Sequence, residues 1–208
     1  MAQPAPVRTQ AERRASTQHA ILDATVETLL EIGYAKTTTN EISRRAGVSH
    51  GILFRYWPTK GELLAAASGR LLERLIEGYR RLDRESASEL SVKAAVERMW
   101  DTHQSREQAA RTELLVASRT EPELAAAMAN REPHHTDEVL AIARAFLPRF
   151  AELRDDFEAL AIGVLCSMQG AAILAAANPS NAEGLRACVI HTTVVLLEPL
   201  LGPERGPR

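Results

Sequence analysis

Aromatic residues, cysteines and long hydrophobic runs are all scarce in this chain of 208 residues. Four Phe, three Tyr and two Trp stand against abundant Ala, Leu, Glu and Arg, a balance that favours helices over sheets. No apolar run is long enough to predict a membrane-spanning helix, and the richest stretch, 159–177, is interrupted by Ser167 and Gln169. We expect that stretch to form a buried helix. The N-terminus lacks the apolar segment of a signal peptide, which predicts a cytoplasmic protein.

The two cysteines, Cys166 and Cys188, lie in apolar stretches without the spacing of a metal or redox site. They are expected to be buried, reduced thiols of an intracellular protein. The chain also lacks H-E-x-x-H, a phosphate-binding loop and C-x-x-C, the short motifs of several large enzyme classes. We therefore expect no enzyme, no cofactor and no metal site.

Charge is distributed unevenly along the sequence. Residues 1–60 hold eight Lys/Arg and five Asp/Glu, a net charge of +3, whereas the remainder holds seventeen and twenty-two, a net charge of −5. A positively charged N-terminal segment followed by a negatively charged remainder suits a polyanionic partner that binds the N-terminal segment.

The N-terminal third of the sequence predicts a series of short helices. Residues 1–14 have the composition of a flexible arm, and helical apolar spacing begins near Ser16. Gly33 is placed to end this helix in a left-handed conformation. Thr38, with Glu41 three residues later, starts a second helix, and Gly47 ends it.

A third short helix follows at once. Ser49 is a suitable N-cap for it, and Pro58 forces Trp57 out of the helical conformation, so the helix ends at residue 56 or 57. Thr59 and Glu62 then open a long fourth helix.

Two short helices joined by a glycine turn describe a helix-turn-helix at residues 38–57. Ile42, Val48 and Leu53 are expected to face inward and fix the crossing of the two helices. We also interpret Ile52 as a packing residue. The face left for DNA carries His50, Gly51, Arg55 and Tyr56, and the glycine permits close approach of the helix backbone to a base pair.

The segment AILDATVETLLEIGYAKTTTNEISRRAGVSHGILFRYWPTKGELL resembles the N-terminal domain of the TetR family of regulators. The match runs from about Arg13 to Leu72, with Gly-Tyr before a Thr cluster, Ala-Gly-Val-Ser in the turn and aromatic-Pro-Thr-Lys at the family's spacing. The resemblance implies an all-α fold: a helix-turn-helix DNA-binding domain at 15–75, then a larger helical domain at 76–202 that binds a ligand and dimerises. Residues 203–208 are expected to form a tail.

The resemblance also implies roles for individual residues. His50 and Gly51 would contact bases, although the family often has Lys or Arg at position 50. The remaining DNA-binding residues, most of them phosphate contacts, would be Thr38, Thr39, Ser49, Arg55, Tyr56 and Lys60. The partner implied is a near-palindromic operator in double-stranded DNA, bound by a homodimer that a small-molecule effector releases.

The C-terminal two thirds predict helices near 88–104, 106–119, 121–147, 154–177 and 181–200, and we expect the last two to form the dimer interface. Polar groups among apolar helix positions suit an effector pocket. The candidates are Trp100, His103, Gln104, Glu113, Ser118, Met168 and Gln169. An alternative function is a DNA-binding protein of architectural or partner-binding type that senses no ligand; it would have the same head domain and a body without a pocket.

Overall fold

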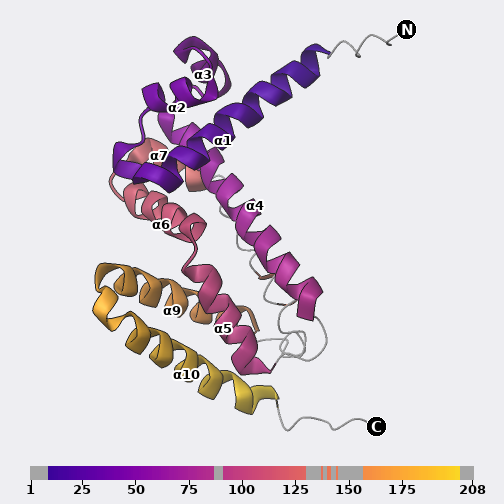
Figure 1. The fold of residues 1–208 in the computed structure, drawn as a ribbon, viewed down its shortest axis with the longest axis vertical. Coiled ribbons are helices and arrows are strands. Elements are labelled where there is room, and N and C mark those ends of the chain that lie inside the picture. The colour runs from indigo at the N-terminus through magenta and orange to yellow at the C-terminus, as the bar shows by residue number, and fades with distance from the viewer. Residues whose placement is uncertain are drawn as a thin grey trace. The chain divides into compact units, whose positions relative to one another are not determined.

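A computed structural model describes residues 9–86, 91–129 and 157–201, together with residues 137, 140, 141 and 144. Every regular element in these ranges is helical, as the sequence predicted (Figure 1). The α-helices are α1 (Gln10–Lys36), α2 (Thr39–Ala46), α3 (His50–Tyr56), α4 (Lys60–Ser86), α5 (Val92–His103), α6 (Arg106–Ser118), α7 (Pro122–Ala129), α9 (Phe157–Ala177) and α10 (Ala182–Leu201). A short 3-10 turn, Pro179–Asn181, precedes α10.

The chain divides into two compact units. The first comprises Met1–Leu71 and Ala110–Arg131, and the second comprises Leu72–Ala109 and Glu132–Arg208. The sequence predicted a simple boundary near residue 75, with all later helices in one domain. The contacts instead group α7 and most of α6 with the N-terminal helices. The expected helix over 121–147 is observed as α7, and the remainder of that range lies largely outside the described residues.

Helix α1 begins at Gln10, earlier than the expected start near Ser16, because Thr9 forms a complete capping box with Glu12. The last residues of the expected flexible arm are therefore helical. Gly33 has the positive φ that its position predicted, 72°, but its ψ of 172° lies outside the left-handed helical region. It therefore kinks the chain, and one further turn continues to Lys36.

The predicted helix-turn-helix is confirmed in its main features. Thr38 accepts a hydrogen bond from the Glu41 N–H and caps α2, and Gly47 ends that helix in the left-handed conformation. Ser49 caps α3, which ends at Tyr56 before an extended Trp57. The inward-facing side chains are confirmed as well: Ile21, Ile42, Leu53 and Leu63 form a fully buried cluster, with Val48 partly buried against it.

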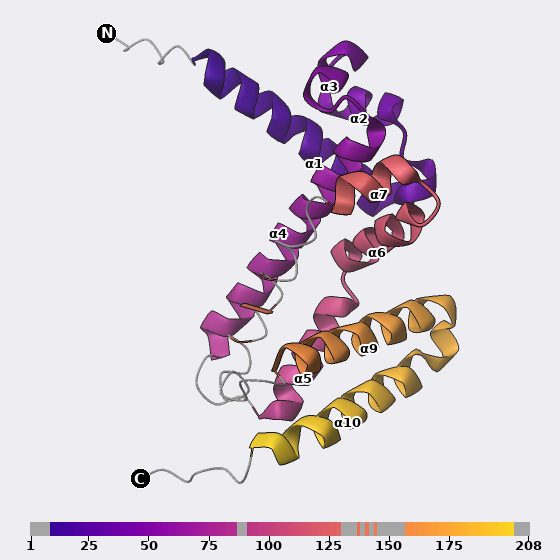
Figure 2. The same ribbon diagram turned by 180° about the vertical axis from the view of Figure 1, so that it is seen from behind.

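A second apolar cluster joins four helices of the first unit. It draws on α1, α4, α6 and α7, and its residues include Val26, Leu29, Leu64, Leu71, Leu114, Leu124 and Met128. The helix-turn-helix and the start of α4 thus share one continuous packed unit with α6 and α7 (Figure 2).

In the second unit, α10 packs along α9 and against α5, and Figure 1 shows α9 and α10 side by side. Their shared core contains Val96, Trp100, Val164, Met168 and Ile190. The expectation of a buried helix over 159–177 is wrong for the single chain. By length and composition alone α9 could cross a membrane, and only 22% of its most apolar stretch is buried in the single chain. The expected burial of the two cysteines is also wrong, since both are exposed.

Candidate DNA-binding surface

The outer face of α3 is open along its length. His50, Gly51 and Arg55 are exposed, Tyr56 is half-buried, and Leu53 on the opposite face is fully buried. Among the described residues, a methyl group added at Gly51 would meet only the Ser49 hydroxyl oxygen, at 3.9 Å. The backbone of the first turn of α3 is therefore accessible from outside, as the sequence predicted for a helix that enters a DNA groove.

Two apolar residues of this face were missed by the sequence analysis. Ile52 and Phe54 are 41% and 38% exposed, so the interpretation of Ile52 as a packing residue is wrong. The Phe54 ring lies edge-on to the His50 ring, with 5.7 Å between the centroids. The helical period could have revealed both, since residues 52 and 54 lie on either side of the inward-facing Leu53.

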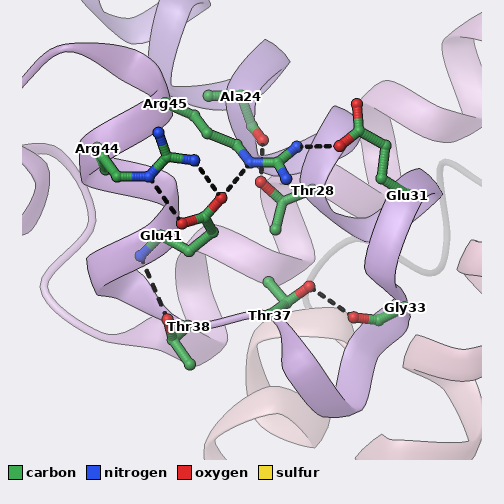
Figure 3. A network of polar contacts seen from close by, with 9 residues as sticks. All are labelled: Ala24, Thr28, Glu31, Gly33, Thr37, Thr38, Glu41, Arg44 and Arg45. Atoms are coloured by element: carbon green, nitrogen blue, oxygen red, sulfur yellow. Dashed lines mark hydrogen bonds and ion pairs between the residues drawn. The ribbon is translucent and has the colours of Figure 1, made fainter.

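An ion-pair network fixes α2 against α1 (Figure 3). Glu41 accepts hydrogen bonds from Arg44 and Arg45, and Arg45 also pairs with Glu31 of α1 at 2.5 Å. Hydrogen bonds from Arg44 and Arg45 lower the pKa of Glu41 to about 2. The Glu41 carboxylate therefore stays charged at neutral pH. The stability that its ion pairs contribute would be lost as the pH falls from 4.5 toward about 2.

The N-terminus of α2 is capped by Thr38 and lies at the surface. The Thr38 hydroxyl oxygen accepts from the Glu41 N–H at 3.2 Å, which leaves the hydroxyl hydrogen available as a donor. Thr38 is exposed and Thr39 is half-buried. Behind them, the Thr37 hydroxyl donates to the Gly33 carbonyl oxygen at 2.7 Å, which fixes the turn between α1 and α2 (Figure 3).

Two cations lie over tyrosine rings at the edges of this surface. The Arg14 guanidinium of α1 is 5.7 Å from the centroid of the Tyr56 ring, and the Lys60 ammonium is 5.1 Å from that of Tyr34. From sequence, Arg14 was expected to lie in a flexible arm without a role, but the cap at Thr9 extends α1 over this residue. Helix α1 brings this arginine to the C-terminal end of α3.

The candidate effector residues are divided between the two units. Trp100 and Met168 are buried in the same cluster of the second unit. His103 is buried in that unit too, and its Nδ1 lies 2.8 Å from the Met99 carbonyl oxygen. Since a carbonyl only accepts, Nδ1 carries the hydrogen, and burial lowers the pKa of His103 and keeps the ring neutral.

The other candidates are placed differently. Gln104 is an exposed C-cap of α5, and Gln169 is half-buried on α9. Ser118 donates to the Leu115 carbonyl oxygen at the end of α6. Glu113, also on α6, accepts a hydrogen bond from the Tyr34 backbone N–H in the first unit. No group of three or more potential metal ligands occurs among the described residues.

Comparisons with known proteins agree with this geometry. The family model described as bacterial regulatory proteins of the tetR family matches residues 21–67, which contain the whole helix-turn-helix. A helix-turn-helix transcriptional regulator of Mycobacterium tuberculosis is 31% identical over 174 residues, which cover 83% of this chain and 89% of the relative.

Solved structures share the fold well beyond the DNA-binding segment. A TetR-family regulator from Pectobacterium atrosepticum has a TM-score of 0.69 at 19% identity and covers 95% of this chain and all of its own. A transcriptional regulator from Saccharomonospora viridis, solved in complex with choline, has a TM-score of 0.59 at 14% identity and covers 84% of this chain and 94% of its own. Because a relative is 31% identical over most of both chains and the family model matches the helix-turn-helix, the chain belongs to the TetR family of DNA-binding transcription regulators.

Proposed function

We propose that this regulator is a cytoplasmic homodimeric repressor that a small molecule releases from its operator. The observation that carries the proposal is the outer face of α3, where His50 and Gly51 are exposed above the buried Leu53. His50 and the backbone at Gly51 would read base edges, and the exposed Ile52 and Phe54 offer apolar contacts to thymine methyl groups. A protein that covers promoter DNA in this way excludes other proteins from it.

Phosphate contacts would surround this reading face. Arg55 and Lys60 supply positive charge, Tyr56 a hydroxyl group, and the N-terminus of α2 at Thr38 and Thr39 free N–H groups. The Ser49 hydroxyl caps α3 and sets the entry of that helix.

Dimerisation is supported by the outer face of α9 and α10. Its large apolar side chains are Ile162, Ile173, Leu174, Val195 and Leu196, each between 39% and 57% exposed in the single chain. A second copy that packed the same two helices against this face would bury them in a four-helix interface. The dimer would present two α3 helices to successive major grooves, about 34–36 Å apart, and would therefore require a near-palindromic operator.

The effector would bind in the second unit. Trp100 and Met168 supply apolar and polarisable surface, and His103 supplies a neutral ring whose Nε2 is a hydrogen-bond acceptor. The S. viridis regulator, which shares this fold, was solved in complex with choline, and this supports a small-molecule ligand for the present chain. The effector would act by preferring the conformation that does not fit the operator.

The direct test selects bound duplexes from a random pool and then screens small molecules for release of the winning sequence. We expect an inverted repeat whose affinity falls steeply with salt, and at least one compound that releases it. Protein that prefers no duplex would refute the DNA-binding proposal. A selected operator that no compound releases would favour the ligand-independent alternative.

Replacing Lys60 by Ala should weaken binding to every duplex alike. The lysine would contact a phosphate, so the plot of log affinity against log salt should flatten by about 0.9. Lys93→Ala removes an exposed lysine of the second unit and serves as the control, with no expected change in slope. Equal salt slopes for wild type and Lys60→Ala would show that Lys60 does not contact a phosphate.

Replacing Gly51 by Ala should separate stability from DNA binding. In the part of the chain that the structure describes, the added methyl meets only the Ser49 oxygen, at 3.9 Å. Alanine also favours a helix by up to about 1 kcal/mol, so the melting temperature should not fall. The same methyl would stand between the α3 backbone and a base pair, so operator affinity should fall by about tenfold or more. Unchanged affinity would show that the α3 backbone does not approach the bases closely.

A further inference from the structure

Two carboxylates of the α6–α7 segment hold Tyr34, the last aromatic residue before α2. Glu113 of α6 accepts a hydrogen bond from the Tyr34 backbone N–H at 2.6 Å. Glu121, directly before α7, accepts one from the Tyr34 hydroxyl group. The backbone N–H and the side-chain hydroxyl group of Tyr34 are thus bound by residues 79 and 87 positions away in sequence, within the same compact unit.

The α6–α7 segment also lies very close to two glycines, one near the end of α1 and one at the start of α4. A Cβ atom at Gly33 would lie 3.1 Å from a carboxylate oxygen of Glu113, and φ at this glycine is 72°. A Cβ atom at Gly61, in the first turn of α4, would lie 2.9 Å from the backbone of Glu123 and Leu124. Helices α6 and α7 therefore meet the end of α1 and the start of α4 with little free space.

Tyr34 connects this junction to the DNA-binding surface. Its ring lies 5.1 Å from the ammonium group of Lys60, a cation–π contact in the proposed phosphate-binding set. Its backbone precedes the turn that leads to Thr38 and the N-terminus of α2. Displacement of Tyr34 would move a side chain and a helix end that we assign to phosphates.

We propose that Glu113 and Glu121 are positioning residues for DNA binding, which act through Tyr34 on Lys60 and on the start of α2. The inference rests on the proposed DNA-binding function and assigns Glu113 a role other than effector binding. Neither carboxylate would touch DNA, since a negative charge at the interface would repel phosphates. Together they hold the α1–α2 junction and the first turn of α4 in the geometry that accepts a duplex.

We expect the stability of the unit to depend little on these two charges. The apolar cluster of α1, α4, α6 and α7, which includes the fully buried Leu64, Leu114 and Leu124, already joins the same helices. Glu113 is an exposed residue overall, and hydrogen bonds near the surface contribute modestly to the free energy of folding. Removal of the carboxylates should therefore change the placement of Tyr34 more than the folding of the unit.

The experiment measures affinity and salt slope on the duplex that wild-type protein selects from a random pool. The variants are Glu113→Ala, Glu113→Gln, Glu121→Gln and Tyr34→Phe, with Glu107→Gln on α6 and Glu123→Gln on α7 as matched controls. We expect Glu113→Ala to lose about tenfold in affinity, with partial recovery in Glu113→Gln because the amide oxygen can still accept from Tyr34. Tyr34→Phe keeps the ring but removes the hydroxyl group, so it should lose more affinity than Glu121→Gln, in which the amide oxygen can still accept from that hydroxyl. The controls should bind as wild type.

A double-mutant cycle separates positioning from a general loss of structure. If Glu113 acts through Lys60, the Lys60→Ala change should cost less affinity in Glu113→Ala protein than in wild type. Additive losses, or a lower melting temperature with unchanged affinity, would overturn the proposal while leaving DNA binding in place. Failure of wild-type protein to select any duplex would instead count against the proposed function.

Discussion

Replacing Leu196 by Glu should convert the dimer into a monomer that no longer holds its operator. Leu196 is 49% exposed on α10, on the face that we assign to the partner subunit. In the variant, dimerisation would bury one unpaired carboxylate from each subunit. The cost of about 4 kcal/mol or more would raise the dissociation constant of the dimer roughly a thousandfold. Light scattering at micromolar concentration should then report the mass of one chain.

The matched control is Val116→Glu, which puts the same charge on an apolar side chain that is 61% exposed on α6. This variant should remain dimeric and bind the operator as wild type does. Operator affinity of Leu196→Glu should fall to the level of a single half-site, because one recognition helix alone makes half of the contacts. A Leu196→Glu protein that keeps the mass of a dimer would place the subunit interface elsewhere.

The same interface would explain the two cysteines. From sequence, Cys166 and Cys188 were expected to be buried because their neighbours are apolar, yet both are exposed in the single chain. An apolar helix gives the same pattern whether it faces its own core or a second copy. Sequence alone cannot separate these two cases, so the helices were located correctly and the burial was not. Slow thiol alkylation in the dimer and fast alkylation in Leu196→Glu would follow from the proposed packing.

The helix-turn-helix was predictable because local chemistry determines it. Gly47 supplies a positive φ, Ser49 a cap and Pro58 a stop, and each acts within a few residues of its own position. The roles of Arg14 and Glu113 were not predictable in this way. Arg14 reaches Tyr56 because a cap at Thr9 extends α1, and Glu113 meets Tyr34 across 79 positions of sequence. Such contacts depend on tertiary packing, which short-range patterns do not encode.

Replacing Gly61 by Ala should destabilise the first unit, although alanine normally favours a helix. The new Cβ atom would lie 2.9 Å from backbone atoms of Glu123 and Leu124, and backbone cannot move aside as a flexible side chain can. Forcing a methyl group into such a site typically costs 1–3 kcal/mol, more than the gain in helix propensity. We expect a net loss of about 1–2 kcal/mol and a melting temperature lower by roughly 2–8 °C.

Gly78→Ala is the control for this prediction, because it is the same substitution in the same helix. Apart from the neighbouring turn of α4, no atom of the residues that the structure describes lies within 4 Å of the added methyl at Gly78, so this variant should be as stable as wild type or slightly more stable. In Gly61→Ala the start of α4 must move away from α7, and Lys60, the residue before it, must move as well. Operator affinity and melting temperature should therefore both fall in Gly61→Ala. Neither quantity should fall in Gly78→Ala. Equal melting temperatures for the two variants would contradict the close contact between α4 and α7 on which the positioning role of Glu113 and Glu121 depends.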